Sequence, residues 1–139
     1  MNPEILIETL SEFEVFEFHE MKKEGRQTKA LYQSEGRTCL LEITGKKGQG
    51  IKAVTLSMGF LTDAMERNSQ TLGIAMGMIK AFFPEWTEGP ACIMADCGEL
   101  ASRDQRATGA GRRIWYKPGI YSVTVQDVGD ARILLTVKK

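Results

Sequence analysis

One segment of the chain, residues 62–83, carries the only pattern long and regular enough to predict a helix by itself. Asp63 followed by Glu66 has the spacing of a capping box, and Pro84 ends the run. The apolar residues recur mostly three or four positions apart, as on one face of an α-helix; they are Leu61, Met65, Leu72, Ala75, Met76, Ile79, Phe82 and Phe83. We therefore expect this helix to organise the fold.

The same spacing predicts which side of the helix faces the core. The side expected to be buried against a sheet carries Leu72, Met76, Ile79 and Phe83. The side expected to be exposed carries Glu66, Arg67, Gln70 and Lys80. Gly73 and Gly77 favour a close approach of the helix to the sheet. The alternative is a Met-rich helix that is shared with a second subunit.

Segments with alternating or β-branched residues predict strands on both sides of this helix. Before it we expect a short helix opened by Asn2-Pro3, then strands at residues 13–19, 28–33, 38–44 and 51–58. A slip at Val15-Phe16 predicts a bulge, and residues 21–26 predict a polar turn. After it we expect a second helix at residues 90–101, a mobile polar loop at 102–111, and strands at 112–117, 120–126 and 131–138.

This order of elements predicts one α+β domain over residues 1–139. We expect antiparallel β-meanders of about seven strands, covered on one face by the long central helix (about 62–83) and one or two shorter helices. The other face of the sheet is expected to be polar and to face water. The order is similar, at the level of topology, to small adaptor and secretion-chaperone-like α+β folds. That resemblance covers no motif, so it implies no functional residue.

The charges balance overall but are distributed unevenly. Lys and Arg number 18, and so do Asp and Glu, so no global field attracts nucleic acid or membrane. Residues 1–24 carry seven acidic and two basic side chains, whereas residues 103–139 carry eight basic and three acidic ones. The favoured interpretation is an acidic N-terminal strand lying beside basic C-terminal strands. The alternative is an electropositive binding face.

The expected compartment is the cytoplasm. No apolar run approaches the roughly 20 residues of a membrane span, and the N-terminus lacks a basic region. The odd number of cysteines, three, argues against a disulfide framework. The sequence leaves open whether a signal peptide has been removed.

Two groups of residues that suggest a phosphate-binding, metal or nucleophile site lack residues that such sites need. The glycine-rich residues 45–50 lack the Ser or Thr of a phosphate-binding loop and lead into a strand, so a hairpin turn is favoured. His19, Cys92 and Cys97 lack the further ligands that a tetrahedral zinc site needs, and no local signature supports a Cys–His nucleophile. We therefore expect no cofactor, metal or catalytic residue. Whether the protein is an enzyme is left open, with a non-enzymatic protein favoured.

One basic and aromatic cluster is the candidate binding surface. It consists of Arg103, Arg106, Arg112, Arg113, Trp115, Tyr116 and Lys117. Such a combination suits phosphate contacts and base stacking. Strand alternation, however, places Arg113, Trp115 and Lys117 on one face of the strand and Arg112 and Tyr116 on the other.

These observations give three hypotheses for function. The first is a non-enzymatic protein- or peptide-binding module, expected to be a homodimer, based on open strand edges and the Met-rich helix. The second is a nucleic-acid-associated protein that uses residues 103–117. The third is a small-ligand-binding protein or small enzyme with a helix–sheet cleft near His19, Tyr32 or Trp115.

Overall fold

The computed structural model describes residues 3–11, 17–24, 27–34, 37–46, 50–60, 65–102, 112–129 and 132–139. The α+β class expected from the sequence is confirmed. In chain order the elements are α1 (Pro3–Ser11), β1 (Glu17–Glu24), β2 (Gln27–Ser34), β3 (Arg37–Lys46), β4 (Gly50–Gly59), α2 (Met65–Phe82), α3 (Gly89–Ser102), β5 (Arg113–Tyr116), β6 (Ser122–Gly129) and β7 (Arg132–Lys138).

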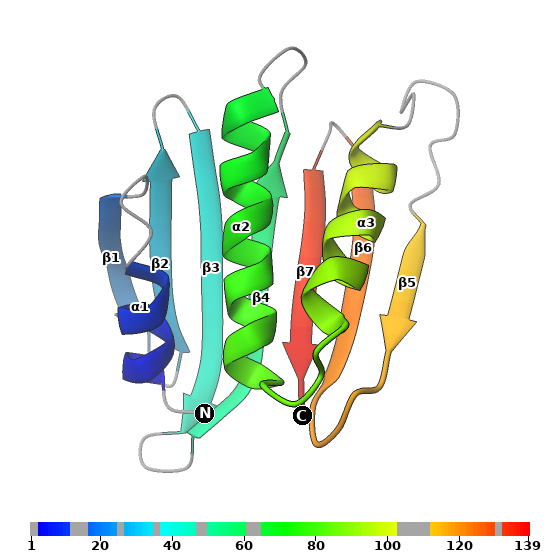
Figure 1. The fold of residues 1–139 in the computed structure, drawn as a ribbon. Coiled ribbons are helices and arrows are strands. Elements are labelled where there is room, and N and C mark those ends of the chain that lie inside the picture. Colours follow the sequence, from blue (N-terminus) through cyan, green and yellow to red (C-terminus); the bar gives the residue numbers. More distant parts are fainter. Residues whose placement is uncertain are drawn as a thin grey trace.

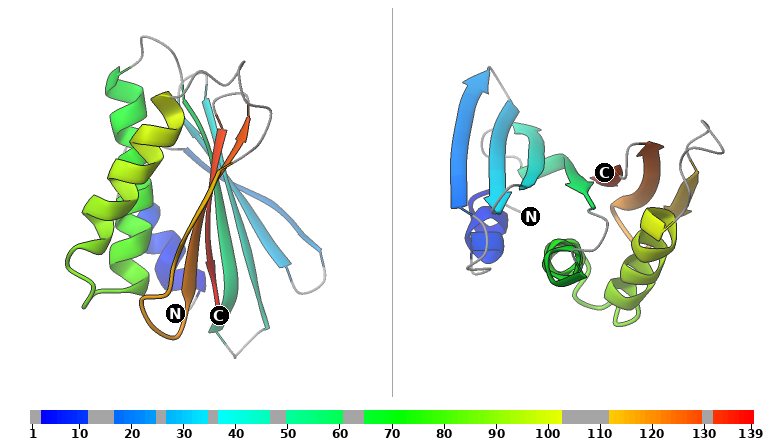
Figure 2. Two further views of the ribbon diagram at one scale, coloured as in Figure 1. Left: turned by 90° about the vertical axis from the view of Figure 1, so that its right-hand side faces the viewer. Right: turned by 90° about the horizontal axis from the view of Figure 1, so that it is seen from above.

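The seven strands of the described residues belong to one antiparallel sheet, in the order β1-β2-β3-β4-β7-β6-β5. The two strand runs on either side of α2 and α3 are joined by the pairing of β4 with β7. Three helices lie on one face of the sheet, with α1 near β1 and β2, α2 in the middle, and α3 against β6 and β7 (Figure 1). No described element covers the other face (Figure 2).

Strand alternation separates a buried row from an open row across the sheet. Leu41, Leu56, Leu135 and Val125 are adjacent in register on β3, β4, β7 and β6, and all four are fully buried beneath the helices. The helices complete this core with Leu6, Leu10, Ile74, Ala75, Met78, Ile79, Ile93, Cys97 and Leu100. The described part of the helix–sheet interface is therefore filled with apolar side chains.

The opposite face of the central strands is polar, as expected. Glu42, Thr55, Thr136 and Thr124 occupy adjacent register positions there, and all are half-buried. The hydroxyls of Thr55 and Thr136 lie 3.4 Å apart. Polar, β-branched residues suit a sheet face that contacts water.

The buried side of α2 differs from the predicted one. Ile79 and Phe83 are buried as expected, but Leu72 and Met76 are only half-buried. The buried stripe instead runs through Thr71, Ile74, Ala75, Met78 and Ile79. The prediction was based on the spacing of apolar residues. It therefore included Leu72 and Met76 and omitted Thr71, which is polar but buried. Among the residues predicted to be exposed, Glu66 and Lys80 are exposed and Gln70 is half-buried. The predicted cap at Asp63 and the side chain of Arg67 lie outside the described residues.

The two glycines of α2 do not bring it close to the sheet, so that prediction is wrong. Gly73 and Gly77 lie two positions on either side of Ala75, which is fully buried. At about 100° per residue, both are roughly 160° around the helix axis from Ala75. They therefore lie on the side of α2 that faces away from the sheet.

Two predictions about the N-terminal strands are also wrong. Residues 21–24 belong to β1 rather than to a turn, because they continue the pairing with β2 after a register shift between Met21 and Glu24. The bulge predicted at Val15-Phe16 lies outside the described residues. The first strand, β1, does not lie beside the basic C-terminal strands as predicted, because β1 and β5 form opposite edges of the sheet.

The reversal between β6 and β7 requires a glycine. Gly129 has φ +87°, a conformation that side chains with a Cβ rarely adopt. Its N–H donates to Oδ1 of the buried Asp127 over 2.9 Å. The register shift between these two residues extends β6 to Gly129, beyond the strand end predicted at residue 126.

Candidate functional site

Five aromatic side chains gather where α2 ends and α3 begins. The connector folds back on itself, since the N–H of Trp86 donates to the carbonyl of Phe83 and the N–H of Gly89 donates to that of Trp86, both at 3.1 Å. The ring centroids of Phe83 and Trp86 are 5.9 Å apart, and those of Trp86 and Tyr116 are 5.5 Å apart. Phe82 and Tyr121 complete the group at 5.1 Å. These edge and tilted contacts hold Trp86 against β5.

Gly89 makes the position of Trp86 possible. A Cβ added to Gly89 would lie 2.4 Å from both Cδ2 and Cε3 of the Trp86 ring. The ring therefore packs directly on the glycine backbone.

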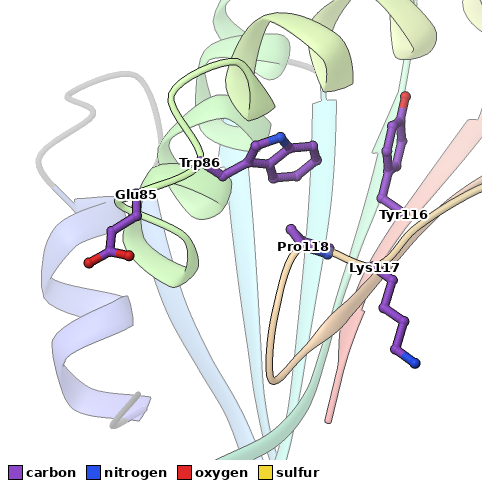
Figure 3. Close-up of a pocket in the computed structure, with 5 residues that line it drawn as sticks. All are labelled: Glu85, Trp86, Tyr116, Lys117 and Pro118. Carbon is purple, nitrogen blue, oxygen red and sulfur yellow. The ribbon is translucent and has the colours of Figure 1, made fainter.

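Next to this cluster lies a shallow, open pocket of about 400 Å³. The rings of Trp86 and Tyr116 and the ring of Pro118 form its apolar walls (Figure 3). Glu85 and Lys117 complete the lining, and their charged ends point away from the rings in Figure 3. Aromatic and proline walls with a few charged groups are typical of a binding site for an apolar or planar group.

The pocket adjoins β5, which forms one edge of the sheet. The N–H of Asp127 donates to the carbonyl of Arg112 over 2.9 Å. In an antiparallel ladder, hydrogen-bonded pairs alternate with non-bonded pairs. The register of β5 with β6 therefore means that the backbone N–H and C=O groups of Ile114 and Tyr116 form hydrogen bonds with β6.

The two intervening residues of β5 leave their backbone groups at the edge. By the same alternation, the N–H and C=O groups of Arg113 and Trp115 point away from β6. No described strand pairs with β5 on that side. The edge thus offers two donors and two acceptors to an added strand.

The structure divides the predicted basic cluster. Arg103 and Arg106 lie outside the described residues. The guanidinium of Arg112 pairs with Glu99 of α3 at 2.8 Å, and that of Arg113 donates to the Gln126 amide oxygen at 3.0 Å.

The aromatic residues of the cluster separate as alternation predicts. Tyr116 packs against the core on the helix side of β5. Trp115 lies on the uncovered face beside Thr124 and is 58% exposed. Lys117 is exposed and projects to the side of the β5 ribbon opposite Tyr116 (Figure 3).

The predicted cluster did not include Glu85, Trp86 or Pro118, which line the pocket. Trp86 lies in a connector between Pro84 and Gly89, a place where a large aromatic residue is unusual. This unusual position of Trp86 is the sequence feature that indicates a special role for the connector. Its neighbour Tyr116 is 30 positions away in the sequence, so no spacing rule joins them.

The charges near the start of β5 include Asp96 of α3. Burial raises the pKa of the Asp96 carboxyl above its ordinary value, Glu99 adds to the rise, and Arg112 opposes it. The Arg112–Glu99 pair is itself exposed, so we treat it as a positioning contact between α3 and β5 rather than a source of stability.

None of the three cysteines forms a disulfide, and two of them, Cys39 and Cys97, are buried. Burial raises the pKa of the Cys97 thiol to about 12. Cys92 is half-buried. Within the described residues no group of three or more His, Cys, Asp or Glu side chains could hold a metal ion. The side chain of His19 lies outside them.

We expect iodoacetamide at pH 8 to label Cys92 of the folded protein before Cys97. The thiolate is the reactive form, and a thiol with a pKa of about 12 holds on the order of one part in ten thousand as thiolate at that pH. Peptide mass mapping over time measures the order, with labelling in 6 M guanidinium chloride as the control. Equal labelling rates of the two cysteines in the folded protein would contradict the buried position of Cys97.

Comparison with known proteins gives no significant match to any family model, curated protein or solved structure. Among the described helices, none is both long enough and apolar enough to cross a membrane.

Proposed function

We propose that this protein is a non-enzymatic module that binds an extended peptide segment of a partner protein. The segment adds to the free edge of β5 as a further strand and places one side chain in the pocket formed by Trp86, Tyr116 and Pro118. The observation that carries the proposal is the juxtaposition of this pocket with the open backbone groups of Arg113 and Trp115. Backbone bonds at a sheet edge give affinity, and pockets for alternate side chains give specificity.

Aromatic groups on both faces of the edge strand support this proposal. Trp115 is exposed on the open face, while Tyr116 and Trp86 lie on the helix face. Successive residues of an added strand point to opposite faces, so one would contact Trp115 and the next would contact Tyr116. Protection against aggregation alone would explain a short edge strand with flanking charges, but it would not explain the pocket.

A display library of random 12-residue linear peptides, selected on the immobilised full chain, tests the proposal. We expect enriched peptides whose affinity falls at least about tenfold in Trp86→Ala, because an aromatic anchor in a pocket commonly contributes more than 1.4 kcal/mol. Ile5→Ala, an exposed substitution on α1, is the control and should change nothing. Failure to enrich any peptide would contradict the proposal.

A second pair of variants tests the backbone contacts separately from the pocket. Arg113→Pro removes an N–H that β6 does not use, at the first residue of an edge strand where proline is tolerated. Arg113→Ala keeps that N–H and is the matched control. We expect the proline variant to bind the selected peptides much more weakly than the alanine variant, which loses only the side chain, as measured by fluorescence anisotropy. Equal affinities of the two variants would show that the peptide does not bond to the backbone N–H of residue 113, which contradicts binding at the β5 edge.

A nucleic-acid-associated function is the second candidate, and the row of Arg113, Trp115 and Lys117 favours it. An exposed aromatic ring between two cations can stack a base and contact phosphates. This function would use neither the pocket nor the open backbone groups, so we rank it below peptide binding. Salt-sensitive binding of a random single-stranded oligonucleotide, lost in the double variant Arg113→Ala/Lys117→Ala, would favour it.

A homodimer stays a prediction from the sequence, and sedimentation at high protein concentration tests it. The third hypothesis, a ligand-binding protein or small enzyme with a cleft between helix and sheet, ranks last. The pocket lies at the β5 edge, and the described helix–sheet interface is filled.

A further inference from the structure

The edge that would receive the peptide carries a charge pattern. Arg113, Trp115 and Lys117 occupy alternate positions in the sequence, and all three are exposed. The contact of Arg113 is with the neutral amide of Gln126, which offsets none of its charge. The uncovered side of the edge therefore presents the order cation, aromatic ring, cation.

Two of the described carboxylates near β5, those of Glu99 and Glu85, lie away from the exposed row of Arg113, Trp115 and Lys117. Glu99 pairs with Arg112, which belongs to the helix side of β5. Glu85 lies beyond Trp86 as seen from Tyr116 (Figure 3). Acidic side chains of an added strand, placed directly across from Arg113 and Lys117, would form favourable cross-strand pairs.

The pocket and the hydrogen-bonding pattern limit which type of residue an added strand can place opposite Tyr116. In a strand added antiparallel to β5, the residues opposite Arg113 and Trp115 form hydrogen-bonded pairs with them. The residue opposite Tyr116 falls in a non-bonded pair, so its N–H is not needed and proline is tolerated. A proline ring there would lie against Trp86, Tyr116 and Pro118, which resembles the aromatic grooves that bind proline-containing peptides.

Building on the proposed function, we propose that the partner segment is an acidic peptide that carries a proline. Its order from the N-terminus is acidic, proline, apolar, any residue, acidic. It runs antiparallel to β5, with its carboxylates opposite Lys117 and Arg113. The proline lies opposite Tyr116, and the apolar residue lies opposite Trp115.

Three acetylated and amidated peptides test this inference by NMR titration of the full chain. The first is Ser-Glu-Pro-Val-Thr-Glu-Ser, the second has both Glu replaced by Lys, and the third has Pro replaced by Ala. We expect the Lys peptide to bind about tenfold more weakly and the Ala peptide about fivefold more weakly. In Arg113→Ala/Lys117→Ala the preference for Glu over Lys should shrink to roughly twofold or less.

The outcomes separate this inference from the proposed function. Equal binding of the Glu and Lys peptides, or of the Pro and Ala peptides, overturns the inference. If the library peptides still bind at the β5 edge in that case, the proposed function stands. No resonance shift with millimolar Glu peptide also overturns the inference, and no enriched library peptide overturns both. Displacement of the Glu peptide by a single-stranded oligonucleotide that binds more tightly would overturn the inference in favour of nucleic acid.

Discussion

Leu135→Ala is expected to lower the free energy of unfolding by about 2–5 kcal/mol. Leu135 is fully buried on β7, between Leu56 of β4 and Val125 of β6 in register. Its removal leaves a cavity at the centre of the sheet, beneath the helices, where neighbouring side chains cannot collapse far. Chemical denaturation in urea, followed by circular dichroism, measures the loss.

The neighbouring residue provides the control. Leu134 lies on the uncovered face beside Ser57 and Gln126 and is half-buried. Leu134→Ala should cost at most about 1 kcal/mol, because little of its contact area is lost from a packed core. Equal losses for the two variants would mean that both faces of the sheet are covered, which contradicts the observed layering.

Gly89→Ala is expected to destabilise the protein by about 1–3 kcal/mol. The added Cβ would meet the Trp86 ring at 2.4 Å. The rings of Phe83 and Tyr116 also contact the Trp86 ring and restrict how it can move. We therefore also expect a change in Trp86 fluorescence, read in a Trp115→Phe background, and weaker peptide binding.

Gly98→Ala is the matched substitution in the same helix. No described atom lies within 4 Å of a Cβ placed there, and the residue is inside α3. It should raise the free energy of unfolding by about 0.5–1 kcal/mol, because alanine restricts the unfolded chain more than glycine does. Equal effects of the two glycine substitutions would show that Trp86 does not pack on Gly89.

The sequence was informative where one face of an element meets the core. Period-two alternation predicted the strands at β6 and β7, and the apolar residues that alternate there, Val123, Val125, Leu135 and Val137, are all buried. In α2 the same approach was misleading, because apolar residues occur on more than one side and the buried Thr71 is polar. The periodicity of a sequence shows only where apolar residues recur along a helix. Which of them are buried also depends on the elements that pack on each side of that helix.

Strand order could not be read from the sequence. Nothing local to β4 or β7 indicates that they pair, and that pairing sends β1 and β5 to opposite edges. The acidic and basic ends of the chain were therefore placed side by side in error. The pocket was missed for the same reason, because Trp86 meets Tyr116 only once β5 lies at the edge. Alternation did predict the faces of Trp115 and Tyr116 correctly.

In the proposed function, the open edge of β5 receives an extended peptide. Amide hydrogen exchange resolved by NMR tests it at single residues. In the free protein, the amides of Arg113 and Trp115 should exchange much faster than those of Ile114 and Tyr116, which bond to β6. Saturation with a selected peptide should slow Arg113 and Trp115 and leave the others unchanged. Slow exchange of Arg113 and Trp115 in the free protein, or protection by the peptide only at other strands, would contradict peptide binding at this edge.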